Sequence, residues 1–249
     1  MKAFIVGVIL AMLSTCYTTG QTNTNEGQLV KKGIMNNQEI INVAFFYLKK
    51  GQEKTFEKLR SRGNVLLEKY GARIERVIKP TMIAQGELEL PNEIHFAVYP
   101  NKEALESFNK DPEFLALKEE VVAPSVEKMY GFVTKKTDFE FVREIGDNTK
   151  TYGIALIYFK QGEKYETQFA QYHDEACAII PEFGTHFERF LLPIESKGEL
   201  EKPNEIHRFY FDSQEGMKQM VSDERMQKLF PKRDGSLSNL IFILGEAIQ

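Results

Sequence analysis

The sequence is poor in cysteine, has no tryptophan and carries no concentrated run of one charge. Cys16 and Cys177 are the only cysteines in 249 residues, which excludes a disulfide framework. If Cys16 is lipidated or removed with a leader, Cys177 has no partner, so stability must come from packing. Lys and Arg total 32 against 36 Asp and Glu, a net charge of −4 without a basic block. We therefore exclude nucleic acid as a partner.

The short motifs that mark common enzyme classes are also missing. The chain has no phosphate-binding P-loop, no GxGxxG, no GxSxG, no HExxH and no CxxC. These absences exclude the motif-defined nucleotide-binding, serine-hydrolase, zinc-protease and dithiol-redox classes. No metal site is predicted, and the sequence leaves the cofactor unknown.

Long uncharged apolar runs are absent except at the start of the chain. Residues 3–13 have the length of a signal-peptide core and are too short to span a membrane, which predicts a signal peptide over residues 1–20. Residues 13–16 resemble a lipobox, which predicts lipidation of Cys16 and a chain held at the cell envelope; cleavage after residues 18–20 instead predicts a periplasmic or secreted protein. Contact with a membrane is expected only through that lipid.

One ten-residue segment occurs twice in the chain, with a single difference. Gly86–His95 reads GELELPNEIH and Gly198–His207 reads GELEKPNEIH, a difference at one position. The elements predicted around each copy follow the same order, which indicates a tandem repeat. Residues 21–39, rich in Thr, Asn, Gln and Gly, are expected to form a flexible tether. The predicted units then span residues 40–145 and 146–249.

Each unit reads as β-α-β-β-α-β, the ferredoxin-like order. Apolar runs predict strands, and apolar residues at helical spacing predict helices. The first unit is predicted to contain strands at 41–48, 73–85, 93–99 and 129–134 (extended through 139–142), and helices at 52–70 and from Asn101 and Asp111. The second is predicted to contain strands at 152–159, 185–192, 205–211 and 240–244, and helices at 163–183 and from Ser213 and Asp223. Because the strands are apolar on both faces, we predict an α+β fold in which two tandem ferredoxin-like (βαββαβ) units form an intramolecular dimeric α+β barrel.

The element order, the NEIH segment and the DPEFLALK helix of residues 111–118 resemble the dimeric α+β-barrel superfamily. The resemblance covers residues 40–134 and 152–244, and is nearest to the uncharacterised short-domain and NIPSNAP-like branches. It implies the barrel fold and a range of activities: cofactor-independent monooxygenases, haem-degrading and haem-dependent enzymes, isomerases and dehydratases. In NIPSNAP-like relatives a histidine stands in the third strand, where this chain has His95 and His207.

The repeated segment supplies the candidate catalytic residues. Glu93 and His95 lie two apart on a predicted strand, as do Glu205 and His207, so each pair shares a face. If the pseudo-twofold brings the pairs together across the barrel, they could serve proton transfer or a metal. The alternative is a structural role as polar groups at the barrel rim or the hairpin end.

The copies differ just after the histidine, where Phe96 and Ala97 become Arg208 and Phe209. Arg208 is expected either at a rim or in a cavity, where it could bind a carboxylate or other anion. Some aromatic residues are expected to line a pocket for a small apolar or ring-shaped ligand. The predicted ligand-binding residues are Arg208, Tyr99 and Tyr158.

His173 and Cys177 lie four apart on one predicted helix face. This spacing can ligate a metal, but it also suits a helix histidine beside a buried thiol, and no other Cys or His lies nearby in sequence to complete a metal site. His186 is interpreted as a surface residue.

Two functions from different classes remain. The prediction is a small-ligand-binding or structural module of the cell envelope, with the barrel interior filled or holding an apolar molecule. The alternative is a cofactor-independent monooxygenase or haem-handling enzyme that uses a strand histidine with Glu93 or Glu205 and Arg208. A pocket present in one copy only would favour the enzyme.

Overall fold

The structure, a computed structural model, describes residues 39–137 and 146–249. The predicted signal peptide, Cys16, nearly all of the tether and the strand extension at 139–142 lie outside these ranges. Within the described ranges, no helix combines the length and the apolar character that crossing a membrane requires.

The first unit forms a four-stranded sheet with helices on one side, in the predicted order. Asn101 and Asp111 cap their helices by accepting hydrogen bonds from backbone N–H groups, and Pro112 takes the first helical position. The elements are β1 (Ile40–Leu48), α2 (Glu53–Glu68), β2 (Arg73–Gln85), β3 (Glu93–Tyr99), α3 (Lys102–Lys110), α4 (Pro112–Leu117), a π-helical turn (Lys118–Val122), α5 (Ala123–Ser125) and β4 (Val126–Lys136).

The second unit has the same order. Ser213 and Asp223 cap its short helices as Asn101 and Asp111 do in the first unit. The elements are β5 (Thr151–Phe159), α6 (Glu163–Ile179), a 3-10 turn (Ile180–Phe183), β6 (Thr185–Lys197), β7 (Glu205–Phe211), α7 (Gln214–Ser222), α8 (Glu224–Ser236) and β8 (Leu237–Ala247).

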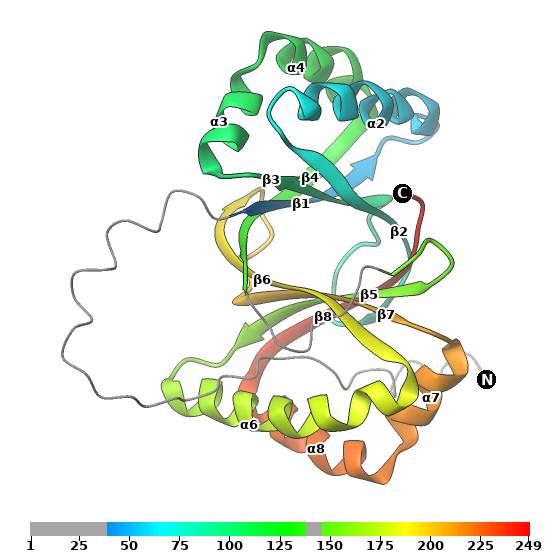
Figure 1. The fold of residues 1–249 in the computed structure, drawn as a ribbon, viewed down its shortest axis with the longest axis vertical. Coiled ribbons are helices and arrows are strands. Elements are labelled where there is room, and N and C mark those ends of the chain that lie inside the picture. The colour runs from blue at the N-terminus through cyan, green and yellow to red at the C-terminus, as the bar shows by residue number, and fades with distance from the viewer. Residues whose placement is uncertain (1–38, 138–145) are drawn as a thin grey trace, which may run out of the picture.

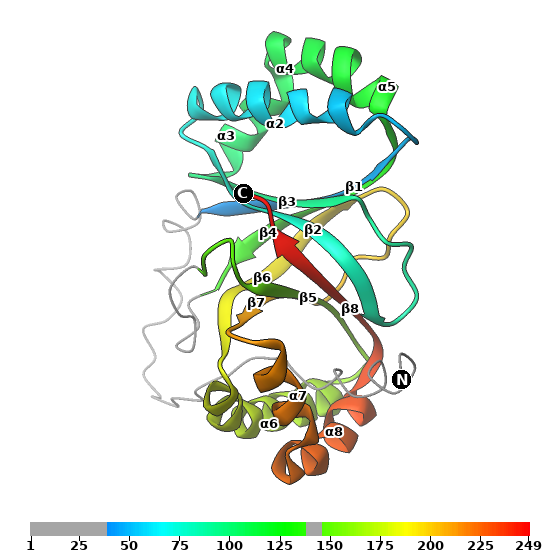
Figure 2. The same cartoon turned by 90° about the vertical axis from the view of Figure 1, so that its right-hand side faces the viewer.

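The eight strands close into one barrel in the order β1-β3-β2-β8-β5-β7-β6-β4. Two seams join the units, because β2 pairs with β8 and β4 pairs with β6, both antiparallel. The helices of each unit cover the outer face of its own sheet, so the helix layers stand at opposite ends of the molecule with the barrel between them (Figures 1 and 2). The predicted α+β fold is confirmed.

Three apolar cores follow from this arrangement. One lies between the two sheets, inside the barrel, and includes Ile41, Phe45, Phe96 and Ile154. The other two lie between each sheet and its helices. Because successive residues of a strand face opposite sides, the even-numbered residues of β3 point into the barrel and the odd-numbered ones toward the helices.

Candidate functional site

A cavity of about 200 Å³ lies between the outer face of the first unit's sheet and its helices. We call it the first-unit cavity. Most of its wall consists of apolar side chains from β1, β3, β4, α2 and α3. Its polar lining residues are Asn42, Arg60, Asn64, His95, Tyr99, Asn109, Lys118 and Lys197.

The floor of the first-unit cavity is a row of residues across four strands. Strand register places side by side, on β3, β1, β4 and β6, the residues His95, Ala44, Gly131 and Lys197. All four line the cavity, as does Ala97 on β3. Directly opposed residues share a sheet face, so the small residues between His95 and Lys197 leave room above the sheet. Lys197 belongs to the second unit, so both units build this cavity.

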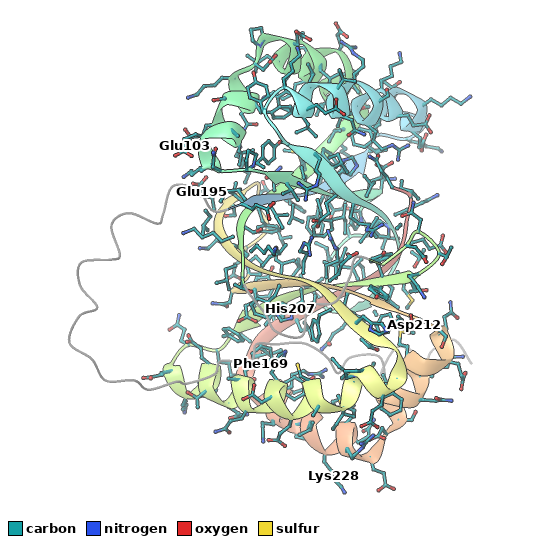
Figure 3. All side chains as sticks on the ribbon, in the orientation of Figure 1. Glu103, Phe169, Glu195, His207, Asp212 and Lys228 are labelled. Carbon is teal, nitrogen blue, oxygen red and sulfur yellow. The ribbon has the colours of Figure 1, made fainter. Side chains whose placement is uncertain are left out.

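The corresponding place in the second unit is filled. Its row consists of His207, Ala155, Phe242 and Gln85. Phe242 stands where the first unit has Gly131, and Phe209 where it has Ala97; the two rings stack with centroids 5.4 Å apart. Figure 3 shows His207 on the sheet that faces α6, with Phe169 of that helix between the helix and the sheet. The same fold therefore has a cavity in the first unit where the second unit has packed phenylalanine rings.

His95 is held in the first-unit cavity by a chain of charged side chains. Its Nε2 lies 2.7 Å from Oε2 of Glu93, and Nη1 of Arg60 on α2 donates to Oε1 of Glu93 at 2.8 Å. The imidazole also packs against the rings of Phe46 and Phe56. A carboxylate on Nε2 favours the proton on that nitrogen and leaves Nδ1 as a lone-pair acceptor. Among the described residues, none forms a hydrogen bond with Nδ1 of His95.

The cavity wall carries a second acceptor without a donor. Oδ1 of Asn64, on α2, is buried and has no hydrogen-bond partner among the described residues. Leaving a buried acceptor unpaired costs about 1–3 kcal/mol. A ligand that carries a hydroxyl or amine could supply the missing donor.

The second histidine of the repeated segment is in a different environment. His207 is fully buried, its Nε2 lies 3.1 Å from Oε2 of Glu205, and its ring packs on Phe190 with centroids 4.1 Å apart. Burial lowers the pKa of His207, against the opposing effect of Glu205. Burial also holds the pKa of His173 well below its ordinary value, with His207 as a smaller contribution. His173 lies 3.0 Å, through Nε2, from Sγ of Cys177 in the same core.

These two buried histidines predict an acid-sensitive fold. Both have a lowered pKa in the folded protein, so below pH 6.5 the unfolded chain binds more protons than the folded one. Their contribution is therefore complete above pH 6.5, and below it we expect the unfolding free energy to fall by up to about 1.4 kcal/mol per pH unit for each histidine. Urea unfolding at a series of pH values checks this. The His173→Gln/His207→Gln variant should show a slope smaller by about two protons; an unchanged slope would contradict the assignment.

The expectation that the two Glu–His pairs meet across the barrel is wrong. His95 packs in the core under the first unit's helices and His207 in the core under the second unit's helices, so the barrel separates them. The described residues contain no group of three or more His, Cys, Asp or Glu that could hold a metal ion. The two Glu–His pairs stay apart because the odd-numbered residues of β3 and β7 face outward, toward the helices, and not into the barrel.

The predicted ligand-binding residues also lie in different parts of the molecule. Tyr99 lines the first-unit cavity, and burial raises its pKa above the ordinary value. Tyr158 packs in the core inside the barrel, where its hydroxyl donates to the carbonyl of Glu201 at 3.1 Å. Arg208 is fully buried within the barrel and donates to Glu188 and Glu75, both at 2.5 Å. The anions that Arg208 binds are thus supplied by the chain itself.

Comparison with known proteins identifies the architecture. A solved anthrone oxidase-like protein is similar with a TM-score of 0.58 at 10% identity, over 86% of this chain and 92% of its own. A proposed monooxygenase from Fusobacterium nucleatum gives 0.57 at 12%, over 86% and 94%, and a chlorite dismutase mutant from Candidatus Nitrospira defluvii gives 0.56 at 10%, over 86% and 92%. The fold is a dimeric α+β barrel.

At these identities the likeness establishes the fold alone. No model of a known protein family matches the sequence, and no curated protein does. The assignment of this dimeric α+β barrel to the short-domain or NIPSNAP-like branch therefore stays a prediction, as does the tandem repeat.

Sequence reasoning missed several residues of the site. Arg60 lies on a helix far from the repeated segment, and its carboxylate partner is known only once α2 is packed on β3. Lys197 reaches the cavity because β6 pairs with β4 of the other unit. The one signal available was the change from Ala97 to Phe209, which marks where the two units differ in volume.

Proposed function

We propose that this protein binds a small ring-bearing molecule in the first-unit cavity. The observation that carries the proposal is the contrast between units: Ala97 and Gly131 leave a space that Phe209 and Phe242 fill at the corresponding place. Protein interiors are close-packed, and a void lined by Leu, Phe and Ala costs stability. A ligand would recover the lost contacts.

The size and lining of the cavity restrict the ligand. An engineered cavity of about 150 Å³ holds one benzene molecule, so about 200 Å³ suits a single substituted ring. Aromatic side chains such as Phe46, Phe108 and Phe114 line the cavity and can contact such a ring edge-on or offset. Nδ1 of His95 and Oδ1 of Asn64 both accept hydrogen bonds, so the ligand should carry a donor such as a phenolic hydroxyl.

The test is a calorimetric titration of the purified chain with phenol, toluene and cyclohexanol. Phenol offers both an aromatic ring and a hydrogen-bond donor. Toluene offers only the aromatic ring, and cyclohexanol offers the donor on a saturated ring. We expect phenol to bind the tightest, since a hydrogen bond to a buried acceptor contributes about 1 kcal/mol, or about fivefold. The absence of binding by all three would contradict a ring-binding cavity.

A second candidate function is supported by the Arg60–Glu93–His95 chain. A histidine oriented by a carboxylate is the arrangement of a general base, and Nδ1 could take a proton from an acidic O–H or C–H of the bound ring. The resulting anion could react with dioxygen at a ring carbon without a cofactor: a C–O bond forms, and when the O–O bond breaks that carbon loses its own hydrogen, so one oxygen stays as a quinone carbonyl and the other leaves as water. The ring supplies all four electrons and both hydrogens of the water. We propose this cofactor-independent monooxygenation as the catalytic form of the same binding function.

The monooxygenase candidate predicts a large effect of His95→Gln. Glutamine keeps hydrogen-bonding capacity but cannot accept the proton, so kcat should fall about 100-fold or more while the Kd changes by less than about threefold. Oxygen consumption with a hydroquinone, which has a single ring, measures this. His186→Gln, on β6 at the surface, serves as the matched histidine control. Equal kcat in His95→Gln and the unsubstituted protein would rule out His95 as the base.

The haem-handling alternative does not fit the first-unit cavity. A space of about 200 Å³ holds little more than one ring, whereas a porphyrin contains four pyrrole rings and their bridges. Nε2 of His95 is also engaged by Glu93. We therefore assign no haem-dependent step to this site.

A further inference from the structure

We propose that the ligand of the first-unit cavity is a hydroxy-substituted aromatic acid, whose carboxylate is bound by Lys118 and Lys197. This inference rests on the proposed ring-binding function and adds the charge of the ligand to it. It follows from the charges around the cavity, the positions of the two lysines and the residues that replace them in the second unit.

The described lining of the first-unit cavity has one sign of charge. It includes Arg60, Lys118 and Lys197 but no aspartate or glutamate. Arg60 is neutralised by its ion pair with Glu93. Lys118 and Lys197 form no ion pair with any residue that the structure describes, and Nζ of Lys118 lies over the ring of Phe114, 5.1 Å from its centroid. Two unpaired ammonium groups at a cavity favour an anionic ligand.

The positions of the charges match a ligand with two different ends. His95 and Lys197 stand at opposite ends of the cross-strand row, with Ala44 and Gly131 between them. Three strand spacings of about 4.8 Å separate their Cα atoms by about 14 Å. After the reach of both side chains, this leaves room for one ring. A phenolic hydroxyl would donate to Nδ1 of His95, and a carboxylate on the far side of the ring would accept from Lys197 and Lys118.

Lysine occurs at these two positions beside the first-unit cavity, but not at the corresponding positions around the packed place in the second unit. In the second unit Gln85 takes the place of Lys197 in the row, paired with Phe242. Counting from the matching caps Asp111 and Asp223, Phe230 takes the place of Lys118. The packed place beneath the second unit's helices therefore has neither cation beside it, as expected if both lysines serve the ligand.

The experiment compares para-hydroxybenzoate with para-hydroxybenzamide, which has the same shape without the charge, by calorimetry on the purified full-length chain. We expect the acid to bind about tenfold more tightly than the amide, and the difference to shrink as salt is raised from about 25 to about 250 mM. Lys118→Gln/Lys197→Gln should reduce acid binding to the level at which the amide binds the unsubstituted chain. Lys228→Gln, exposed on α8 at the far end of the molecule (Figure 3), is the matched control.

Each other outcome is decisive. If acid and amide bind equally, the ligand class is wrong while the ring-binding function stands. If the acid retains its advantage in the double lysine variant, the assignment of Lys118 and Lys197 is wrong. If neither compound binds but phenol does, this inference fails and the ring-binding function stands; if phenol fails to bind as well, both fail.

Discussion

A chain carrying Asn42→Gly and Ala97→Phe is expected to fold normally and to lose ligand binding by about 100-fold or more. The two changes copy the second unit, where Gly153 and Phe209 occupy the corresponding pair across neighbouring strands. The glycine is needed because a Cβ at Gly153 would lie 2.3 Å from Cε2 of Phe209. A phenylalanine ring in the first-unit cavity occupies the space of a ligand ring, and burying it contributes about 1.5–3 kcal/mol of transfer free energy.

Calorimetric titration with phenol or para-hydroxybenzoate measures the loss, and urea unfolding measures the stability. Asn42→Gly alone is the control, because it leaves the first-unit cavity open and should bind within about threefold of the unsubstituted chain. Unfolding of the double variant should be as cooperative as before and its free energy no lower. A double variant that is folded and still binds would show that the ligand lies elsewhere.

Replacing Glu188 by glutamine should cost the barrel about 3–5 kcal/mol of stability. Glu188 is fully buried in the barrel and accepts from Nε of Arg208 at 2.5 Å, from Nη2 of Arg76 at 2.9 Å and from the backbone N–H of Gly146 at 3.0 Å. Removing one partner of a buried ion pair costs about 3–5 kcal/mol, because the other charge is left uncompensated. Arg76 would lose its carboxylate here, and Arg208 would keep only Glu75.

The position of Glu188 explains how buried glutamates and arginines of the two units come together inside the barrel. The strand registers shift at Glu188 on β6 and at Glu75 on β2, and such bulges turn an extra side chain to a different face. Each carboxylate then binds an arginine of the other unit, Glu188 with Arg76 and Glu75 with Arg189. Burial acts to raise the pKa of Glu75, but the arginines outweigh it and hold that pKa below its ordinary value.

Glu195→Gln is the matched control for Glu188→Gln, since both glutamates lie on β6. The side chain of Glu195 is 46% exposed and pairs with Lys102, so its loss should change the unfolding free energy by less than about 1 kcal/mol. Chemical unfolding of both variants checks the contrast. A loss below about 1 kcal/mol for Glu188→Gln would mean that the buried charges stabilise the barrel no better than neutral groups do.

The sequence allowed the fold to be predicted much further than the site. Apolar runs such as INVAFFYL and matched helix caps identified the strands and helices, because each depends on neighbours in the chain. The face on which His95 lies could not be predicted, since both faces of β3 are buried and its pattern EIHFAVY does not alternate. Arg60 and Lys197 were missed for a related reason: their positions depend on helix packing and on the β4–β6 seam.

The order of strands in the closed barrel has a consequence for biosynthesis. β2 finds its outer partner only in β8, the strand synthesised after all the others in the barrel, with Ile78 opposite Ala247. Until the second unit is made, the inner face of the first sheet, with Ile41, Val43 and Phe45, has nothing to cover it, and the edge of β2 stays open until β8 follows. Pairings between distant parts of a chain form slowly, and uncovered apolar sheets with open edges aggregate. The nascent first unit is therefore the stage at which this protein should depend most on chaperones.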